Sequence, residues 1–174
     1  MAEIRAFRGF RYDPARVGPL AEVVCPPYAV IDPPLQEQLY AASPYNAIRL
    51  ELTRDEPGSP ASRYERAAAT LRSWLLDGIL RQDTARSLYV YEQEFELEGT
   101  RQCRRGFFAR VRLEPFGQGS IFPHEQTLAG PKADRLQLYR ATGFNISPIF
   151  GLYPDPAQEV IALLEPFTRL APPL

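Results

Sequence analysis

The prolines of this chain constrain its fold more than any other feature. There are 18 of them in 174 residues, and several come in pairs or near pairs. A proline ring fixes φ and removes a backbone donor, so it breaks helix interiors and central strands. The prolines therefore divide the chain into short elements joined by stiff loops. The clusters are Pro26-Pro27, Pro33-Pro34, Pro57 with Pro60, Pro154 with Pro156, and Pro172-Pro173.

Four helices are predicted between these breaks. Asp32 before Pro33 is a typical helix start, with a capping side chain followed by proline in the first turn. Ser62 and Glu65 match a capping box. Gly143 supplies a typical stop after a run that opens near residue 130. The helices are expected at residues 33–42, from 62 to about 75, from 130 to about 142, and at 157–167.

Alternation of apolar and polar residues predicts the strands. The clearest pattern is a β-hairpin of residues 88–97 and 102–113 around Glu98-Gly99-Thr100. Its face with Tyr89, Tyr91 and Phe95 is expected to be the more buried one. Further strands are expected at residues 4–12, 46–52 and 145–153. The predicted fold class is α+β, with a mixed, mainly antiparallel sheet, a long central hairpin and about four helices in a single domain, 1–174.

Composition and charge exclude several protein classes. The chain is 45% hydrophobic and 24% charged, which is typical of a globular domain and not of a disordered one. A formal net charge of −1 argues against general nucleic-acid binding. No apolar run approaches the roughly 20 residues of a membrane span. Glu3, Arg5 and Arg8 interrupt the start of the chain, so a signal peptide is not expected and the predicted compartment is the cytoplasm.

Common catalytic and redox motifs are missing from the sequence. Cys25 and Cys103 lie far apart and belong to no paired metal or redox motif, so both are interpreted as reduced, small apolar residues. The sequence contains no Walker loop, Rossmann glycine fingerprint, serine elbow or cysteine-protease signature. Any site must therefore be recognised from individual side chains.

One window of the chain concentrates such side chains. Lys132 is the only lysine among the 20 basic residues, and it falls in the first turn of a predicted helix that Gly130 opens. A cation is unfavourable at that end of a helix unless an anion such as phosphate also binds there. Arg135 one turn later, with Thr127 and Asn145 nearby in sequence, completes the candidate phosphate-binding set. The alternative is a solvated lysine on a surface helix.

The candidate catalytic groups are His124 and Glu125, which precede this helix in the sequence. His124, the only histidine, titrates near neutrality and can pass a proton. Glu125 can act as a base or bind magnesium that arrives with a nucleotide. Neighbours in an extended segment point in opposite directions, so both reach one ligand only if the backbone bends after Pro123. The alternative for His124 is a hydrogen-bonded structural residue, and no structural metal site is expected.

A family resemblance rests on strings spread over nearly the whole chain. Together they resemble the N-terminal part of the family numbered 1015 among domains of unknown function (DUF). The strings are Tyr12-Asp13-Pro14, residues 24–31 (VCPPYAVI), residues 43–50 (SPYNAIRL), residues 88–93 (LYVYEQ), Arg105-Gly106-Phe107, residues 123–127 (PHEQT), residues 130–136 (GPKADRL) and residues 145–150 (NISPIF).

The resemblance has implications for architecture and activity. Members of the family are usually longer, which implies that this chain resembles the first part of such a protein, and that a site shared with a missing C-terminal half would be incomplete here. They often occur beside serine-biosynthesis genes. A more distant similarity to the ParB and sulfiredoxin-like fold implies nucleotide binding or phosphorylation of free serine. This sequence departs from that fold's pattern because it lacks the arginine-rich nucleotide motif of the partition proteins.

Three functions are therefore considered. The first is a cytoplasmic protein that binds a phosphate-bearing ligand or nucleotide, with Mg²⁺, and phosphorylates a small hydroxyl metabolite such as serine. The second is a non-catalytic metabolite-binding module built from the same residues. The third is an interaction module whose Pro-Tyr loops and hairpin face a partner, either the missing C-terminal half or a second copy in a homo-oligomer.

Overall fold

A computed structural model describes residues 2–124 and 126–170 of the chain. It divides into two compact units, each built from separate stretches of chain. The helical unit comprises Phe10–Gln82 and Glu125–Phe150. The hairpin unit comprises Met1–Gly9, Asp83–His124 and Gly151–Leu174. The single domain expected from the sequence stays a prediction.

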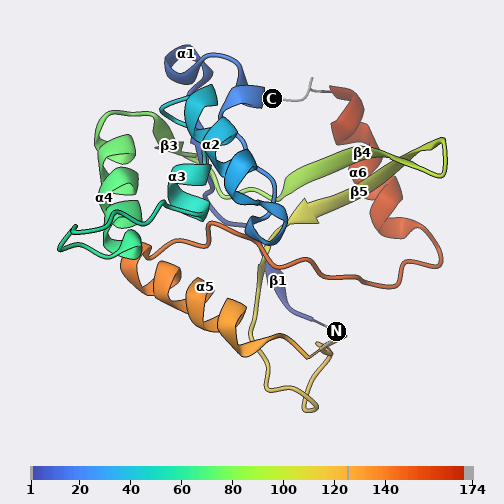
Figure 1. The fold of residues 1–174 in the computed structure, drawn as a ribbon. Helices are drawn as coiled ribbons and strands as arrows, with labels where there is room; N and C mark the ends of the chain where they lie inside the picture. Colours follow the sequence, from blue (N-terminus) through green and yellow to red (C-terminus); the bar gives the residue numbers. More distant parts are fainter. Residues whose placement is uncertain (1, 125, 171–174) are drawn as a thin grey trace. The chain divides into compact units, whose positions relative to one another are not determined.

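Helices dominate the helical unit. They are α1 (Pro14–Val17), α2 (Pro33–Ala42), α3 (Ile48–Glu51), α4 (Arg63–Leu76) and α5 (Ala129–Thr142), with short 3₁₀ turns at Leu20–Glu22 and Tyr28–Val30. Strand β2 (Phe10–Tyr12) pairs antiparallel with β3 (Leu80–Gln82). Figure 1 shows α2 to α5 in cyan to orange.

The apolar core of this unit surrounds Trp74 of α4. Its buried members are Val17, Val23, Leu50, Leu71, Trp74 and Ile79. The rings of Tyr12 and Tyr45 contact Trp74, with centroid distances of 5.9 and 6.2 Å. Because α4 presents its apolar stripe to this core and also packs against α3 and α5, it holds the elements that carry the candidate site.

The hairpin unit contains the long hairpin and one helix. Strands β4 (Tyr89–Leu97) and β5 (Thr100–Phe108) pair in register, β1 (Ile4–Arg5) pairs with β6 (Arg110–Val111), and α6 (Glu159–Leu170) packs against β4. Figure 1 shows the two hairpin strands as the longest arrows, in yellow-green, with α6 in red. The only described apolar residue of this unit that is buried is Leu164 of α6.

The α+β class and the predominance of antiparallel pairing are confirmed. The structure has three separate two-stranded antiparallel sheets among its described residues, with β4–β5 as the longest. The four predicted helices correspond to α2, α4, α5 and α6, and two four-residue helices, α1 and α3, add to them. The capping box of α4 forms, with Ser62 and Glu65 each bonded to the other's backbone amide.

The predicted strand at residues 46–52 is wrong, because Asn46 starts a helix there. Its buried side chain donates to the carbonyl oxygens of Glu22 and Val24, at 2.8 and 2.9 Å. Its Oδ1 accepts from the amide of Ile48 at 3.0 Å, which starts α3. These bonds reach about 22 to 24 residues back along the chain, so the local alternation pattern could not reveal them.

Other predicted strands are interrupted or missing. The strand at 4–12 divides into β1 and β2, since the Gly9 amide donates to the Tyr89 hydroxyl at 2.6 Å instead of joining a ladder. Residues 145–153 form no strand and cross from the helical unit to the hairpin unit. The last helix begins at Glu159 because Asp155 accepts from the amides of Val160 and Ile161.

The hairpin face that carries Tyr91 is less covered than predicted. Tyr91 is 42% exposed and Leu97 57% exposed, although Phe95 is half-buried. No helix among the described residues is long and apolar enough to cross a membrane.

Candidate functional site

A network of alternating charges joins three helices of the helical unit. Arg135 of α5 lies between two carboxylates: its Nη1 is 3.1 Å from Glu51 Oε1, and its Nε donates to Asp134 Oδ2 at 2.9 Å. Asp134 also pairs with Arg63, the first residue of α4. The order of charges is therefore Glu51, Arg135, Asp134, Arg63, and the two acids balance the two bases.

Glu51 is the most buried member of the network. Its side chain is 6% exposed, against 23% for Arg135. The Ser147 hydroxyl lies 2.6 Å from both Glu51 carboxylate oxygens. The Arg135 guanidinium also donates to the Glu51 carbonyl at 3.0 Å and lies 4.2 Å from the centroid of the Tyr28 ring. Because these contacts satisfy the buried carboxylate, the cost of removing its charge from water is largely offset.

Asp134 connects α5 to α4. Its Oδ1 accepts from the Tyr64 hydroxyl at 2.7 Å. Burial acts to raise the pKa of Asp134, but hydrogen bonds from Arg135 and Tyr64 and the charges of Arg135 and Arg63 together hold it below its ordinary value of 3.8. The carboxylate form is therefore favoured in the folded protein.

This pKa shift predicts an acid-sensitive part of the stability. A lowered pKa contributes stability that is full above the ordinary value and is lost as pH falls through the folded-state value. Unfolding by urea between about pH 5 and 2 should therefore show a smaller acid loss in Asp134→Asn than in the wild-type chain. Glu65→Gln is unsuitable as the control because Glu65 closes the capping box, whereas the exposed Glu98→Gln leaves the network intact. Parallel acid slopes in Asp134→Asn and wild type would contradict this assignment.

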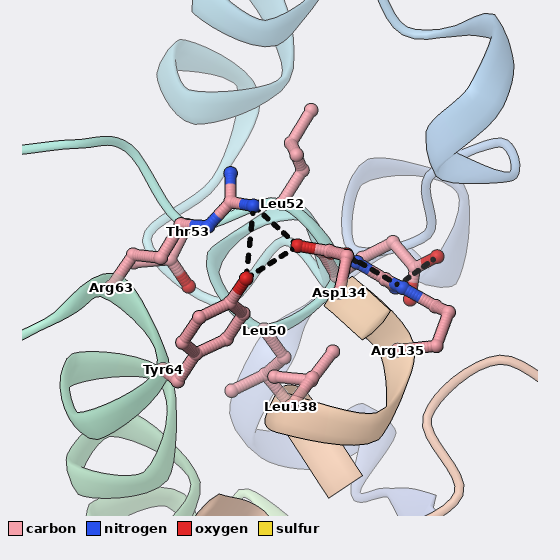
Figure 2. Close-up of a pocket in the computed structure, with 9 residues that line it drawn as sticks. Leu50, Leu52, Thr53, Arg63, Tyr64, Asp134, Arg135 and Leu138 are labelled. Carbon is pink, nitrogen blue, oxygen red and sulfur yellow. Dashed lines mark hydrogen bonds and ion pairs between the residues drawn. The ribbon is translucent and has the colours of Figure 1, made fainter. Parts of the chain in front are cut away.

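The pocket beside this network is small. Figure 2 shows Arg63, Tyr64, Asp134 and Arg135 directed toward one another, with Leu50 and Leu138 beneath them. The cavity has a volume of about 10 Å³, enough for about one water molecule. The network therefore holds α3, α4 and α5 together and leaves room for little more than one water molecule between its side chains.

Cys25 lies close to this network, and its thiol is expected to be unreactive. Burial, and secondarily the negative charge of Glu51, raise the pKa of the Cys25 thiol to about 12. A thiol with so high a pKa holds almost no thiolate near neutral pH, and the thiolate is the nucleophile. The interpretation of Cys25 as a small apolar residue agrees with this placement.

Alkylation tests the state of Cys25. At about pH 8 a thiol reagent should label the exposed Cys103 rapidly and Cys25 only slowly in the native protein. The Cys103→Ser variant isolates the slow reaction, and denaturant should make Cys25 react at the rate of a model thiol. Rapid labelling of Cys25 in the native variant would show that its thiol is accessible and activated.

The first turn of α5 is the other part of the candidate site. Leu128 occupies the N-cap position and provides no capping side chain, and the turn contains no acidic residue. Pro131 has no amide hydrogen, and the amide of Lys132 donates to the carbonyl of Leu128 at 3.3 Å. In an α-helix the amides of Ala129 and Gly130 have no intrahelical acceptor. Lys132 is exposed at this end. A Cβ added to Gly130 would meet open space.

The structure places the predicted site residues as follows. Thr127, Gly130, Lys132 and Asn145 are exposed residues of the helical unit, whereas Arg135 is half-buried in the charge network. His124 is exposed and belongs to the hairpin unit. Glu125 lies outside the described residues. The roles of these residues in catalysis and phosphate binding stay predictions. Among the described residues no group of acidic, histidine and cysteine side chains has the arrangement of a metal site.

Sequence reasoning missed the partners of Arg135. Glu51 and Ser147 are 96 residues apart, and neither stands out by local pattern. A usable signal did exist. Tyr28, Asp134 with Arg135, and Ser147 fall in three of the strings that carry the family resemblance, and Glu51 directly follows a fourth. The structure brings all four segments together around one guanidinium.

Comparisons with known proteins identify the family alone. A search of curated proteins and a search of solved structures each found no match. The similarity to the ParB and sulfiredoxin-like fold therefore gains no support and stays a prediction. The model of a protein family of unknown function, DUF1015, matches residues 4–174, nearly the whole chain. On this match, the chain belongs to the DUF1015 family.

Proposed function

We propose that the first turn of α5 binds a phosphate-bearing ligand, with a nucleotide as the expected class. The observation that carries the proposal is an uncapped turn that lacks acidic residues and has Lys132 exposed beside it. Helix amides and an ammonium group at the positive end of the helix dipole favour an anion there. Thr127 and Asn145 supply the polar groups that would orient it.

The charge network supports this role by anchoring the turn. Asp134 and Arg135 lie in the second turn of α5, two and three residues after Lys132, and they bind this turn to α3 and α4. A phosphate site gains affinity when its donors are held in place before binding, because less order must be gained on association. Within the proposal, Arg135 acts as a positioning residue as long as Glu51 and Asp134 occupy its guanidinium.

The reaction proposed for the site is transfer of a terminal phosphoryl group to a hydroxyl metabolite such as serine. The hydroxyl oxygen forms a bond to phosphorus, the bond from phosphorus to the nucleotide oxygen breaks, and a general base accepts the hydroxyl proton, the role that the sequence predicts for His124 or Glu125. Mg²⁺ would enter with the nucleotide and neutralise phosphate charge. In the second candidate function the same turn holds a metabolite without reaction.

Thermal unfolding tests ligand binding. The chain is heated with ATP, ADP, CTP, pyrophosphate or serine, with and without magnesium. A ligand at 100 times its Kd should stabilise the folded state by about 2.7 kcal/mol. Lys132→Ala should lose most of this stabilisation, whereas Arg140→Ala, an exposed residue in the last turn of the same helix, should keep it. Equal stabilisation of Lys132→Ala and wild type would refute the role of Lys132.

Turnover separates the enzyme from the binding module. If the chain is a kinase, His124→Ala or Glu125→Gln should lower the rate of phosphate transfer while leaving nucleotide affinity within about threefold. If the chain is a binding module, nucleotide binds, but neither the wild-type chain nor the two variants form phosphorylated product. Both variants retain Lys132, so the result does not depend on the phosphate contact itself.

A further inference from the structure

The β4–β5 hairpin lacks the cover that a strand pair of this length ordinarily needs. Each strand has nine residues, and among the described residues neither pairs with a third strand. An isolated two-stranded hairpin is marginally stable in water, and a third strand or an apolar cover is generally required. Helix α6 packs against β4 but contributes only Leu164 as a buried apolar residue. The edges of this hairpin are therefore suited to accept another strand.

The turn geometry identifies which backbone groups face outward. Glu98 and Gly99 form a two-residue loop with φ of 49° and 74°, and Leu97 pairs directly with Thr100. The pair that closes such a loop is hydrogen-bonded, and hydrogen-bonded and non-hydrogen-bonded pairs then alternate along the ladder. Glu94 and Cys103 form a non-hydrogen-bonded pair, so their amides and carbonyls point away from the hairpin, to opposite edges. Arg101 and Arg105 likewise direct their backbone groups outward from β5.

The two edges differ in charge. Strand β4 carries Glu92, Glu94 and Glu96 and no basic residue. Strand β5 carries Arg101, Arg104 and Arg105 and no acidic residue. Arg101 pairs with Glu94, and Arg105 Nε lies 2.5 Å from Glu92 Oε2, so acidic side chains already bind β5 from the β4 side. Arg101 and Arg105 lie on the same face of β5, so a strand on the other side of β5 would meet these two guanidinium groups, which favours acidic residues at cross-strand positions on that face.

The apolar face of the hairpin adds a second requirement. Tyr91 and Phe108 contact each other at a centroid distance of 5.4 Å, yet they are 42% and 37% exposed. Leu97 lies on the same face and is also exposed. Because side chains alternate between faces, a strand added to β5 would bring every second residue onto this face. Apolar residues at those positions would cover the rings.

We propose that the outer edge of β5 binds an extended polypeptide segment in which acidic and apolar residues alternate, as they do in β4. The segment pairs its backbone with the outward groups of Arg101, Cys103 and Arg105, directs its acidic residues to the arginines, and places its apolar residues against Tyr91 and Phe108. Recognition of this kind, by strand addition to an open edge, takes affinity from the main chain and specificity from side chains on alternate positions. The proposal goes beyond phosphate binding and does not depend on it.

A peptide with the sequence of β4 itself, YVYEQEFEL, is the probe for this edge. It is labelled with fluorescein, blocked at both ends and titrated with the full chain by fluorescence anisotropy. The control peptide, YVYKQKFKL, keeps the apolar residues and reverses the charges. The wild-type chain should bind the acidic peptide about tenfold or more tightly than the basic one at low salt, and the difference should shrink as salt is added.

Matched proline variants locate the edge. Cys103→Pro removes an outward amide from β5, and Glu94→Pro removes the outward amide directly across the hairpin from β4. Neither substitution removes a ladder hydrogen bond. Cys103→Pro should weaken peptide binding by about tenfold, whereas Glu94→Pro should stay within about threefold of wild type. An equal effect of the two variants would overturn the assignment to β5.

A charge variant keeps the test decisive if the prolines disturb folding. Arg101 is exposed on β5, on the face to which the bound segment directs its acidic residues, and Arg101→Glu should weaken binding of the acidic peptide and strengthen binding of the basic one. An unchanged preference would overturn the proposal. Size-exclusion chromatography at increasing concentration tests a second copy as the occupant. If the wild-type chain self-associates at high concentration and Cys103→Pro does not, the edge of β5 binds another copy of the chain, which would overturn the proposed occupant.

Discussion

Replacing Arg135 with methionine should lower the free energy of unfolding by about 3 to 5 kcal/mol. Methionine has a similar length but no charge, so Glu51 would stay buried with Ser147 as its remaining side-chain partner. Asp134 would keep Arg63 and Tyr64. The cost arises because an unpaired buried carboxylate loses its hydration without an opposite charge in return.

Urea denaturation of Arg135→Met and of a matched control measures this effect. Arg140→Met makes the same change on the same helix at an exposed position, and it should stay within about 0.5 kcal/mol of wild type. A loss below about 1 kcal/mol for Arg135→Met would mean that the network contributes no more than a surface ion pair. The account of α5 as an anchored helix would then be wrong.

Replacing Asn46 with leucine should lower the free energy of unfolding by about 3 kcal/mol, since the three hydrogen bonds of this buried side chain disappear together. Asn46 is 1% exposed, and its side chain joins the carbonyls of Glu22 and Val24 to the amide that starts α3. Leucine has a similar volume, so little of the loss would come from a cavity. The buried amide of Ile48 would be left without an acceptor, which costs more than the bond itself contributes.

The control for Asn46→Leu is the same substitution at Asn145. Asn145 is exposed in the same unit, and Asn145→Leu should change the free energy of unfolding by less than about 0.5 kcal/mol. Equal losses at the two positions would show that the three hydrogen bonds of Asn46 contribute nothing specific. Circular dichroism of Asn46→Leu should also show a small loss of helix if α3 fails to form.

Elements with local signals were predictable from sequence. Helix α2 occupies the predicted residues because Asp32 accepts from the amide of Leu35 and Pro33 favours the first turn. Helix α5 ends where predicted, with Gly143 in the left-handed region at φ 72°. These signals act within four residues of each helix end, so one sequence suffices to recognise them.

Elements that depend on distant contacts were not predictable in this way. The alternation in residues 46–52 is typical of a strand, but bonds from Asn46 to the segment at Glu22 and Val24 impose a helix. The same limit applies to the site. The position of Lys132 in the first turn of a helix followed from Gly130 and Pro131. The contacts of Arg135 with residues 51, 134 and 147 exist only in the folded chain.

The two proposals assign different work to the two units. The helical unit has a well-formed core and an anchored helix start, as expected for a part that binds a small anion. The hairpin unit buries a single apolar residue among those described and has open strand edges, as expected for a part that another polypeptide covers. Lys132 and Cys103 variants should therefore act independently, each changing one kind of binding.

Amide chemical shifts measured during a titration test the proposed phosphate site most directly. With ¹⁵N-labelled chain and ADP plus magnesium as the probe, the account predicts the largest shifts at the amides of Ala129, Gly130 and Lys132, and their loss in Lys132→Ala. Saturable shifts centred on another part of the chain, with these three amides unmoved, would contradict it.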